Sequence, residues 1–479
     1  MLRLAKDALI YGGGDFVLRL LSFAIFPVYA HLFSVADYGA LELVGTAVSI
    51  ILMISTCGLN SSIQRYYWDP TSTERTQRNL VTTGVTLQLL FGLLAVVSAG
   101  VLLWIFHQSL NQRYGISATV ASLALATIPL TLVVQYAGDV LRLQFSPWKY
   151  SILSFMRNIA GVIASVVLVA GLGFGLDGVF LGSVIGLSLG LIVSFYLVPV
   201  LWKGRFDLEN ARSLCGYGYP LVFAGIAYWI FGSMDRWMLS EMSSMQETGL
   251  YSIAFKFSGI LQLLLVAFGQ AWSPFSIRLF RDRPDYRRVY GAVLSVWTFL
   301  LAAGTAAITL FASELLFFLT PAEYHAAAPI VGWCTAGVAL YGTTQVTAVG
   351  ISLEKKTHLL ARAAWLVALI NLVLNYLFIP HLGAIGAAVA TFISYGVLTG
   401  LYIWWTQRLH PIELQLWPLA VGFILISLVA VLGTFLPVAG FRLDVFLVKV
   451  VAVLGLAIVI LRSSKVRDLI LEPNVGMAK

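Results

Sequence analysis

Long apolar segments joined by short loops make up nearly the whole of this chain. A helix of roughly 20 apolar residues is needed to cross the hydrocarbon core of a bilayer. The segments predict fourteen such helices, at about 9–33, 39–64, 79–106, 117–143, 150–172, 177–201, 215–240, 248–276, 289–312, 325–353, 359–379, 384–406, 415–436 and 443–461. No loop exceeds roughly fifteen residues, which leaves no room for a soluble domain. We therefore expect an all-α polytopic membrane protein.

Basic residues are confined almost entirely to every second loop and to the two termini. This set holds 23 of the 30 Lys and Arg residues: Arg3, Lys6, Arg65, Arg75, Arg78, Arg142, Lys149, Lys203, Arg205, Arg212, Arg278, Arg281, Arg283, Arg287, Arg288, Lys355, Lys356, Arg362, Arg408, Arg462, Lys465, Arg467 and Lys479. The interleaved loops carry only Arg113 and Arg442. Because cytoplasmic loops carry the excess of basic residues, both termini are expected in the cytoplasm.

Composition restricts the classes of function. Hydrophobic residues make up 59% and charged residues 11% of the chain, outside the range of soluble domains. The net charge of +8 is spread over short loops, so it orients the chain in the membrane and predicts no nucleic-acid partner. Cys57, Cys215 and Cys334 lie in or beside apolar runs without pair spacing, which favours packing over disulfide or metal binding. The first apolar segment is too long for a cleavable signal peptide.

The chain repeats itself after six helices. Gly175–Gly186 and Gly383–Ser394 both begin with Gly-x-x-Gly and continue with small residues. Tyr38–Leu41 and Thr248–Tyr251 open two further helices at nearly the same offset. An even number of helices preserves orientation, so the halves are parallel repeats of the kind found in rocking transporters. The expected parts are an N-terminal lobe of helices 1–6, a C-terminal lobe of helices 7–12, and an extra helix pair with a cytoplasmic tail, at residues 1–212, 213–410 and 411–479.

Small and polar residues inside these helices predict close packing. Four glycines recur at four-residue spacing in one helix: Gly178, Gly182, Gly186 and Gly190. Such a stripe lets two backbones approach closely, and a moving hinge is the alternative interpretation. Asn371 and Asn375 are expected to hydrogen-bond between helices.

Ionisable groups deep in the helices are the candidate functional residues, because each costs ~2.5–3.5 kcal/mol or more unless it faces a partner or a wet cavity. These groups are Asp15, Arg19, Arg157, Asp235, Arg236 and Lys256. Asp15 and Arg19 lie four residues apart and could neutralise each other instead of meeting a substrate. Neighbouring residues of a helix do not face each other, so Asp235 or Arg236 should point elsewhere.

Other charges have simpler explanations. Arg157 and Lys256 could also extend their long stems toward the interface. Glu42, Asp139 and Lys449 lie near helix ends or on the extra pair, where interfacial solvation is expected to suffice. The arginines of Arg278–Arg288 are expected to fix the topology, with contact to anionic lipid as a second interpretation.

Several chemistries have no sequence signature here. There is no G-x-x-x-x-G-K-[ST] loop for nucleotide, no metal-ligand spacing and no repeated filter motif. We therefore expect no cofactor, no metal and no catalytic residue, and an energy supply from a gradient or from removal of product.

Three stretches resemble one family. They are LIYGGGDFVLRLLSFAIFPVYAHLFSVADYGALEL near the N-terminus, SMDRWMLS…TGLYSIAFKFSGI within Ser233–Ile260, and Asn371-x3-Asn375 with Pro380 and GAIGAAVATFIS. From Met1 to about Arg408 the chain resembles bacterial oligosaccharide flippases, the Wzx-type polysaccharide biosynthesis proteins. These belong to the multidrug/oligosaccharidyl-lipid/polysaccharide exporter superfamily. The resemblance implies two six-helix lobes around a central cavity.

The resemblance also implies a function. Such proteins move a polyprenyl-pyrophosphate-linked oligosaccharide from the cytoplasmic to the outer leaflet of the bacterial plasma (inner) membrane by alternating access. Asp235, Arg236 and Lys256 match by motif, whereas Arg19 and Arg157 rest on position and charge. The implied substrate-binding residues are Arg19, Arg157, Arg236 and Lys256, and the candidate ion-coupling residues are Asp15 and Asp235. Expected partners are the lipid-linked oligosaccharide, membrane lipids, and the polysaccharide polymerase and chain-length machinery.

Two other functions compete with this one. A cation-coupled drug exporter of the same superfamily would favour a cavity with more acids than bases, but the deep residues give four bases against two acids. A membrane polysaccharide polymerase or ligase would need a sizeable external loop bearing catalytic groups, and the external loops are short and nearly uncharged. Flipping assisted by the membrane potential is the expected energy source, with proton or sodium coupling as the alternative.

Overall fold

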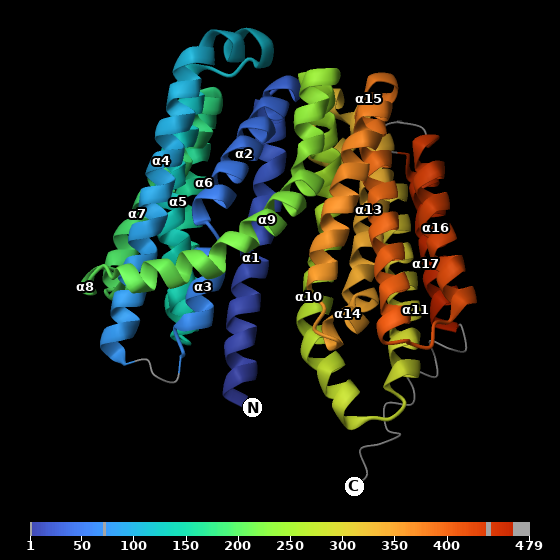
Figure 1. The fold of residues 1–479 in the computed structure, drawn as a ribbon. Coiled ribbons are helices and arrows are strands. Elements are labelled where there is room, and N and C mark those ends of the chain that lie inside the picture. Colours follow the sequence, from blue (N-terminus) through green and yellow to red (C-terminus); the bar gives the residue numbers. More distant parts are fainter. Residues whose placement is uncertain (1, 70–72, 437–441, 463–479) are drawn as a thin grey trace. The chain divides into compact units, whose positions relative to one another are not determined.

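The computed structural model describes residues 2–69, 73–436 and 442–462, and the elements in these ranges are all helical. The predicted all-α class is confirmed (Figure 1). The chain divides into two compact units, Met1–Trp229 and Ile230–Lys479, with the division inside helix α9. The expected lobe boundaries at residues 212 and 410 stay predictions. Each unit is described by itself below.

Unit 1 is built from helices that follow the predicted spans closely. They are α1 (Leu2–Leu32), α2 (Val35–Thr56), α3 (Leu59–Tyr66), α4 (Glu74–Tyr114), α5 (Ala118–Leu143), α6 (Pro147–Val166), the π-helix η1 (Val167–Gly171), α7 (Gly175–Leu197), α8 (Val200–Lys203) and the first part of α9 (Leu208–Met242). The span expected at 39–64 is broken at Cys57 and Gly58, which both have positive φ. A side chain at Gly58 would collide with the backbone of Gly218, so this break lets α9 approach closely.

Unit 2 is centred on α13. Its elements are the rest of α9, α10 (Met245–Asp282), α11 (Tyr286–Leu310), α12 (Ala312–Leu319), the 3₁₀ helix η2 (Ala322–Ala327), α13 (Ala328–Thr347), α14 (Val349–Leu353), α15 (His358–Leu409), α16 (Leu416–Thr434) and α17 (Leu443–Arg462). Helices α10, α11, α15 and α16 pack against α13. This central position explains why α13 is almost wholly buried.

Eleven helices in the described ranges are long and apolar enough to cross a membrane. One of them, α15, has 52 residues and is two helices merged across Gly383. A shorter apolar helix lies at Phe16–Leu32. The protein is therefore a multi-pass membrane protein, and the number fourteen stays a prediction.

The backbone bears out the sequence repeat. Gly175 and Gly383 are equivalent in the repeat, and their φ angles are +55° and +54°. Three residues after each of them, a second glycine packs on the end of the preceding helix. A Cβ at Gly178 would lie 3.2 Å from the backbone of Leu168, and one at Gly386 would lie 2.6 Å from the backbone of Phe378. Both halves therefore turn the same tight corner, which only glycine accommodates without strain.

The corner at Gly383 has two further ties in unit 2. Glu247, in the first turn of α10, accepts a 2.7 Å hydrogen bond from the backbone N–H of Ala384. Asn371 donates to the Ser394 hydroxyl at 3.3 Å and accepts from Asn375 at 3.0 Å. The prediction that the two asparagines form interhelical hydrogen bonds is thus confirmed for Asn371.

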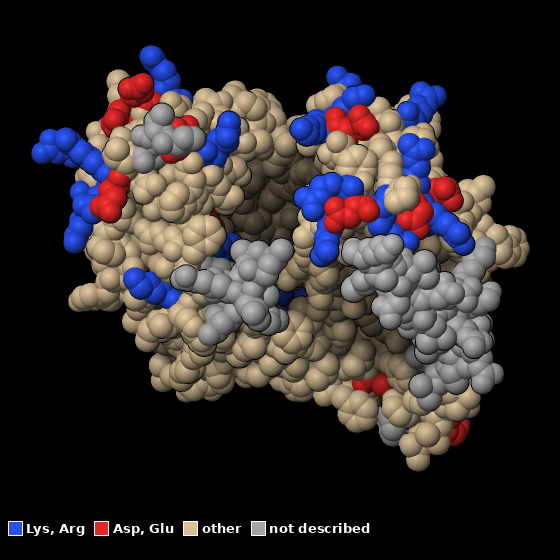
Figure 2. Space-filling model, turned by 90° about the horizontal axis from the view of Figure 1, so that it is seen from below, with Lys and Arg blue, Asp and Glu red and all other residues tan. Residues whose placement is uncertain are grey.

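Basic residues gather at one end of each unit, as Figure 2 shows on the face seen from below. The α10–α11 turn is one such group. Arg278 and Arg281 pair with Asp282 at 3.3 and 2.8 Å, and their side chains are 78% and 79% exposed. Arg283 donates two hydrogen bonds to Asp285, and this holds the pKa of Asp285 below its ordinary value. The aspartates therefore stay ionised and offset part of the basic charge.

The glycine stripe of α7 is a packing surface against α6. A Cβ on Gly186 would lie 2.6 Å from the Cα of Gly161, and one on Gly190 would lie 2.9 Å from the Cβ of Arg157. Because the atoms in the way are mostly backbone, they cannot move aside as a flexible side chain could. The packing interpretation of the stripe therefore accounts for the glycines without a hinge.

We predict that Gly186→Val forces α6 and α7 apart. Overpacking typically costs about 1–3 kcal/mol, and backbone obstruction should place this variant at or above the upper end. The measurement is the melting temperature in detergent. Gly100→Val in α4 is the control, since no atom lies within 4 Å of a Cβ there. Equal melting temperatures for the two variants would contradict the packing role.

The last described helix is anchored by a buried ion pair. Lys449 of α17 donates to both oxygens of Glu314 in α12, at 2.7 and 2.9 Å. The two side chains are only 13% and 9% exposed. The expectation that interfacial solvation accounts for Lys449 is wrong, because its ammonium group is held inside the unit by a carboxylate from another helix.

Removing one charge of the Glu314–Lys449 pair should destabilise the protein far more than replacing both residues by apolar ones. We predict that Glu314→Gln destabilises the protein by about 3–5 kcal/mol, because Lys449 is left buried without a counter-charge. The double variant Glu314→Leu/Lys449→Met should recover most of that loss. Thermal melting measures both effects. Asp444→Asn is a matched control, since the Arg442–Asp444 pair is 66% and 65% exposed and should contribute at most about 1 kcal/mol.

Candidate functional site

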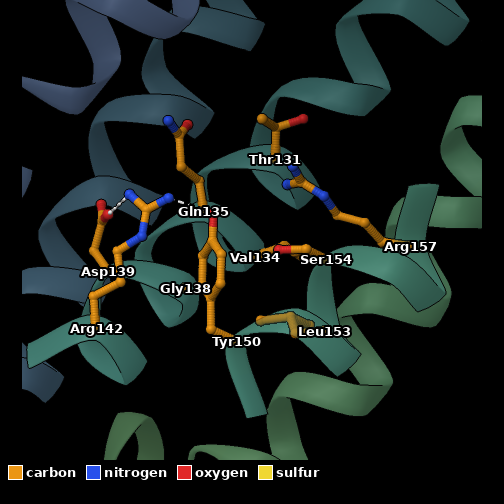
Figure 3. Close-up of a pocket in the computed structure, with 10 residues that line it drawn as sticks. All are labelled: Thr131, Val134, Gln135, Gly138, Asp139, Arg142, Tyr150, Leu153, Ser154 and Arg157. Carbon is orange, nitrogen blue, oxygen red and sulfur yellow. Dashed lines mark hydrogen bonds and ion pairs between the residues drawn. The ribbon is translucent and has the colours of Figure 1, made fainter. Parts of the chain in front are cut away.

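A polar pocket of about 240 Å³ lies between α5 and α6 in unit 1 (Figure 3). Among the described residues, ten line it: Thr131, Val134, Gln135, Gly138, Asp139, Arg142, Tyr150, Leu153, Ser154 and Arg157. The pocket lies wholly within unit 1. One of the predicted cations, Arg157, is among its lining residues.

The helical period explains why these residues meet. On α5 the polar lining residues recur every three or four positions, so they form one stripe of the helix: Thr131, Gln135, Asp139 and Arg142. On α6 the same spacing joins Tyr150, Ser154 and Arg157. A short turn links the two helices, and Pro147 starts α6 at its first position. The hairpin thus sets two polar stripes face to face.

The end of the pocket next to this turn, called the turn end below, holds a three-residue group. Arg142 lies 3.7 Å from the carboxylate of Asp139 and donates a hydrogen bond to the Tyr150 hydroxyl. Its guanidinium also lies 4.3 Å from the centre of the Tyr150 ring, within the range of a cation–π contact. The Arg142 side chain is 46% exposed and that of Asp139 is 12% exposed. Arg142 is therefore oriented by its neighbours while its guanidinium remains reachable.

Arg157 occupies the inner end. It lies ten residues into α6, which is about 15 Å along the helix axis from the turn. Figure 3 shows its guanidinium directed toward Thr131, on the side of the pocket opposite Arg142. The glycines of α7 press on the backbone and Cβ of Arg157 from behind. Close helix packing therefore fixes the position from which this cation enters the pocket.

Of the other predicted residues of unit 1, Arg19 is not among the described residues that line the pocket. Arg19 is exposed on α1, which packs against α6 near Gly14 and Ser151. The side chain of Asp15 falls outside the described part of the chain. Asp139 was expected to need only interfacial solvation; it is instead paired and lines the pocket. The polar stripe at three- and four-residue spacing is the signal that could have found Gln135, Asp139 and Arg142.

A second cluster of charges lies buried in unit 2. Asp235 and Arg236 of α9 are 3% and 8% exposed. Asp235 accepts a hydrogen bond from the hydroxyl of Tyr251, which is fully buried on α10. The Arg236 guanidinium donates to the Gly232 carbonyl at 3.2 Å and lies 5.1 Å from the ring centre of Phe255.

The expectation that Asp235 and Arg236 cannot face each other is wrong. The Asp235 carboxylate bends back to accept the backbone N–H of Arg236 at 2.9 Å, and the Arg236 side chain folds to within 3.5 Å of the same oxygen. A flexible arginine can do this because burial makes any nearby counter-charge valuable. Lys256 follows Phe255 on α10 and is half-buried.

The two clusters differ in what they can do chemically. The pocket of unit 1 offers two guanidinium groups, one carboxylate and several hydroxyl and amide groups to a ligand. Guanidinium groups bind phosphate oxygens with two parallel hydrogen bonds. In unit 2 the acid and the arginine are paired with each other and are only 3% and 8% exposed, so a ligand has little access to them. The unit 1 pocket is therefore the better candidate for holding an anionic group.

Known proteins share the sequence pattern. A model of the family described as "Polysaccharide biosynthesis protein" matches residues 4–280. The "Probable low-salt glycan biosynthesis flippase Agl15" of Haloferax volcanii is 26% identical over 322 residues, which are 65% of this chain and 66% of that protein. The "Succinoglycan biosynthesis transport protein ExoT" of Rhizobium meliloti is 26% identical over 327 residues, which are 65% of this chain and 61% of that protein. Each match spans less than two thirds of the relative's length.

Solved structures share the fold. The lipid II flippase MurJ in an inward closed conformation has a TM-score of 0.73 at 16% identity, covering 96% of this chain and 100% of that one. An inward-facing multidrug resistance MATE family transporter of the MOP superfamily has a TM-score of 0.63 at 13% identity, covering 85% and 97%. Since the family model covers more than half of its residues, the chain belongs to the polysaccharide biosynthesis protein family.

Proposed function

We propose that this protein moves a polyprenyl-pyrophosphate-linked oligosaccharide from the cytoplasmic to the outer leaflet by alternating access, for surface polysaccharide synthesis. Family membership supports a role in polysaccharide biosynthesis. The names of two relatives and the fold shared with a lipid II flippase support transport rather than sugar chemistry. The observation that carries the proposal is the polar pocket between α5 and α6, with Arg157 at its inner end.

The chemistry of the cargo fits this pocket. A pyrophosphate carries negative charge that cannot cross hydrocarbon alone, so a carrier must supply cations and hydrogen-bond donors along the path. Arg157 can bind a phosphate oxygen pair in its planar fork. Thr131 and Ser154 place hydroxyl groups in the same pocket. In this proposal Arg157 holds the pyrophosphate while the sugars extend toward the turn between α5 and α6, the end of the helix hairpin that is expected to face the cytoplasm.

The other predicted cations have supporting roles in the proposal. Arg19 and Lys256 would attract the anionic head group from α1 and α10. Arg236 would add positive potential while remaining tied to Asp235 and the neighbouring rings. Asp15 and Asp235 remain the proposed ion-coupling residues. The membrane potential, worth ~2.3 kcal/mol per charge per 100 mV, would favour outward movement of an anionic head group.

A cation-coupled drug exporter is the second candidate. The fold shared with a MATE family transporter favours it. A site for organic cations needs an excess of carboxylates, whereas the described lining of the unit 1 pocket has two arginines and one aspartate. The excess of basic over acidic residues in this described lining favours an anionic cargo.

Arg157→Ala should weaken binding of a polyprenyl pyrophosphate roughly tenfold to a hundredfold, the loss expected for hydrogen bonds to a charged group. Arg157→Lys should recover only part of the affinity, because an ammonium group cannot reproduce the planar fork. Binding to the purified protein in nanodiscs and flipping in proteoliposomes are the measurements. Arg442→Ala, in an exposed loop, is the control. Wild-type affinity and flipping in Arg157→Ala, at normal abundance, would refute the assignment.

We further propose that the chain lies in the bacterial plasma (inner) membrane with both termini in the cytoplasm, beside the polymerase and chain-length machinery. Gln246 is exposed in the first turn of α10, at the end of that helix opposite the arginine-rich turn.

A cysteine at Gln246, in a chain whose three cysteines are replaced by serine, should react from outside intact cells with an impermeant thiol reagent. A cysteine at Arg281, at the other end of α10, should react only after the cells are permeabilised. Labelling with the opposite pattern would mean that the proposed orientation is reversed.

A further inference from the structure

The second arginine of the pocket, Arg142, forms an ion pair with a carboxylate of the protein, that of Asp139. Asp139 and Arg142 lie three residues apart on α5, and their charged atoms are 3.7 Å apart. This separation satisfies an ion pair but exceeds a normal hydrogen bond. Arg142 donates a hydrogen bond to the Tyr150 hydroxyl and lies over that ring. The aromatic side chain thus orients the guanidinium, while the carboxylate attracts it from a distance.

The two arginines reach the pocket at different ends. Arg157 lines the inner end. At the turn end Arg142 is paired with Asp139. Figure 3 shows the two guanidinium groups entering from opposite helices, with Gln135 and Ser154 also lining the space. Tyr150 and Arg157 are seven residues apart on α6, about 10 Å of helix axis, and Arg142 and Arg157 line the same pocket.

We propose that Asp139 is a built-in competitor for Arg142: it holds the guanidinium when the pocket is empty, yields it to the cargo phosphate on binding, and takes it back to promote release. This rests on the proposed function. An anion arriving beside Arg157 brings charges that can approach Arg142 closer than 3.7 Å and accept hydrogen bonds from it. The cargo therefore gains a second cation, but at the cost of separating the existing pair.

This competition should keep the affinity of the pocket for its cargo moderate. A carrier that bound its cargo as tightly as two uncompensated arginines allow would release it slowly, because differences in affinity appear mainly in the dissociation rate. A carboxylate that competes for one of the two cations speeds that step. Tyr150 is a positioning residue in this scheme, since it keeps Arg142 between its two possible partners.

The test uses a sugar-free polyprenyl pyrophosphate as the binding probe and its lipid-linked oligosaccharide form for flipping. Asp139→Asn keeps the shape of the side chain and removes the competing charge. It should bind the probe about fivefold or more tightly, the lower range of site-to-site coupling, and should flip more slowly per turnover. Asp139→Glu keeps the competing charge and should therefore show no such gain in affinity.

A double-variant comparison isolates the pair. Arg142→Gln should weaken binding, and in Asp139→Asn/Arg142→Gln the gain from the first change should vanish, because the two side chains act as one unit. Melting temperatures close to that of the wild type establish that each variant is folded.

Three results would overturn the proposal. Weaker probe binding by Asp139→Asn would make the carboxylate a ligand of the cargo, and unchanged binding would make the ion pair purely structural. A gain that persists in the double variant would place its origin away from Arg142. If one of these results is found and Arg157→Ala nevertheless loses probe binding, the role of Asp139 is refuted but the proposed function is not. Normal probe binding by Arg157→Ala would instead contradict the proposed function.

Discussion

The structure depends on one constraint: an ionised side chain inside a bilayer protein must have a partner, because hydrocarbon solvates it very poorly. Each described cluster of charges meets this requirement in a different way. Glu314 and Lys449 form a tight pair between two helices. Asp235 and Arg236 satisfy each other within one helix, with help from Tyr251. Asp139 and Arg142 are only loosely matched. Looser pairing leaves a charge that can change partners, so it marks where a charged cargo can act.

Helix placement could be read from the sequence because length and hydrophobicity alone decide which segments can cross a bilayer. The repeat was also visible, since Gly175 and Gly383 occupy corners that no larger residue enters without strain. Arg157 was found because its position deep in a helix is costly. What the sequence could not reveal is the partner of each charge. Asp139 and Lys449 looked solvated from their distance to helix ends, but tertiary packing from α6 and α12 covers them.

The local rule on helix neighbours failed for a related reason. Facing pairs at three- and four-residue spacing describe rigid side chains standing on a helix surface. Arg236 has a long, flexible stem, and in a buried setting it curls back toward Asp235 instead of extending. The sequence therefore identified the right residues in unit 2 and misjudged their geometry. In unit 1 the polar stripe on α5 is visible in the sequence. Only the structure shows that a matching stripe on α6 faces it and that the two line a pocket.

The anchor of α17 also bears on how the chain is made. Glu314 and Lys449 are 135 residues apart. At 5–20 residues per second, the ribosome delivers the lysine on the order of ten seconds after the glutamate. During that interval the carboxylate of α12 has no ammonium partner, so it must remain near water, stay protonated, or be shielded by the insertion machinery. The packing of Glu314 is therefore completed only when α17 is inserted, and a chain cut short before α17 would carry an unpaired acid that membrane quality control can detect.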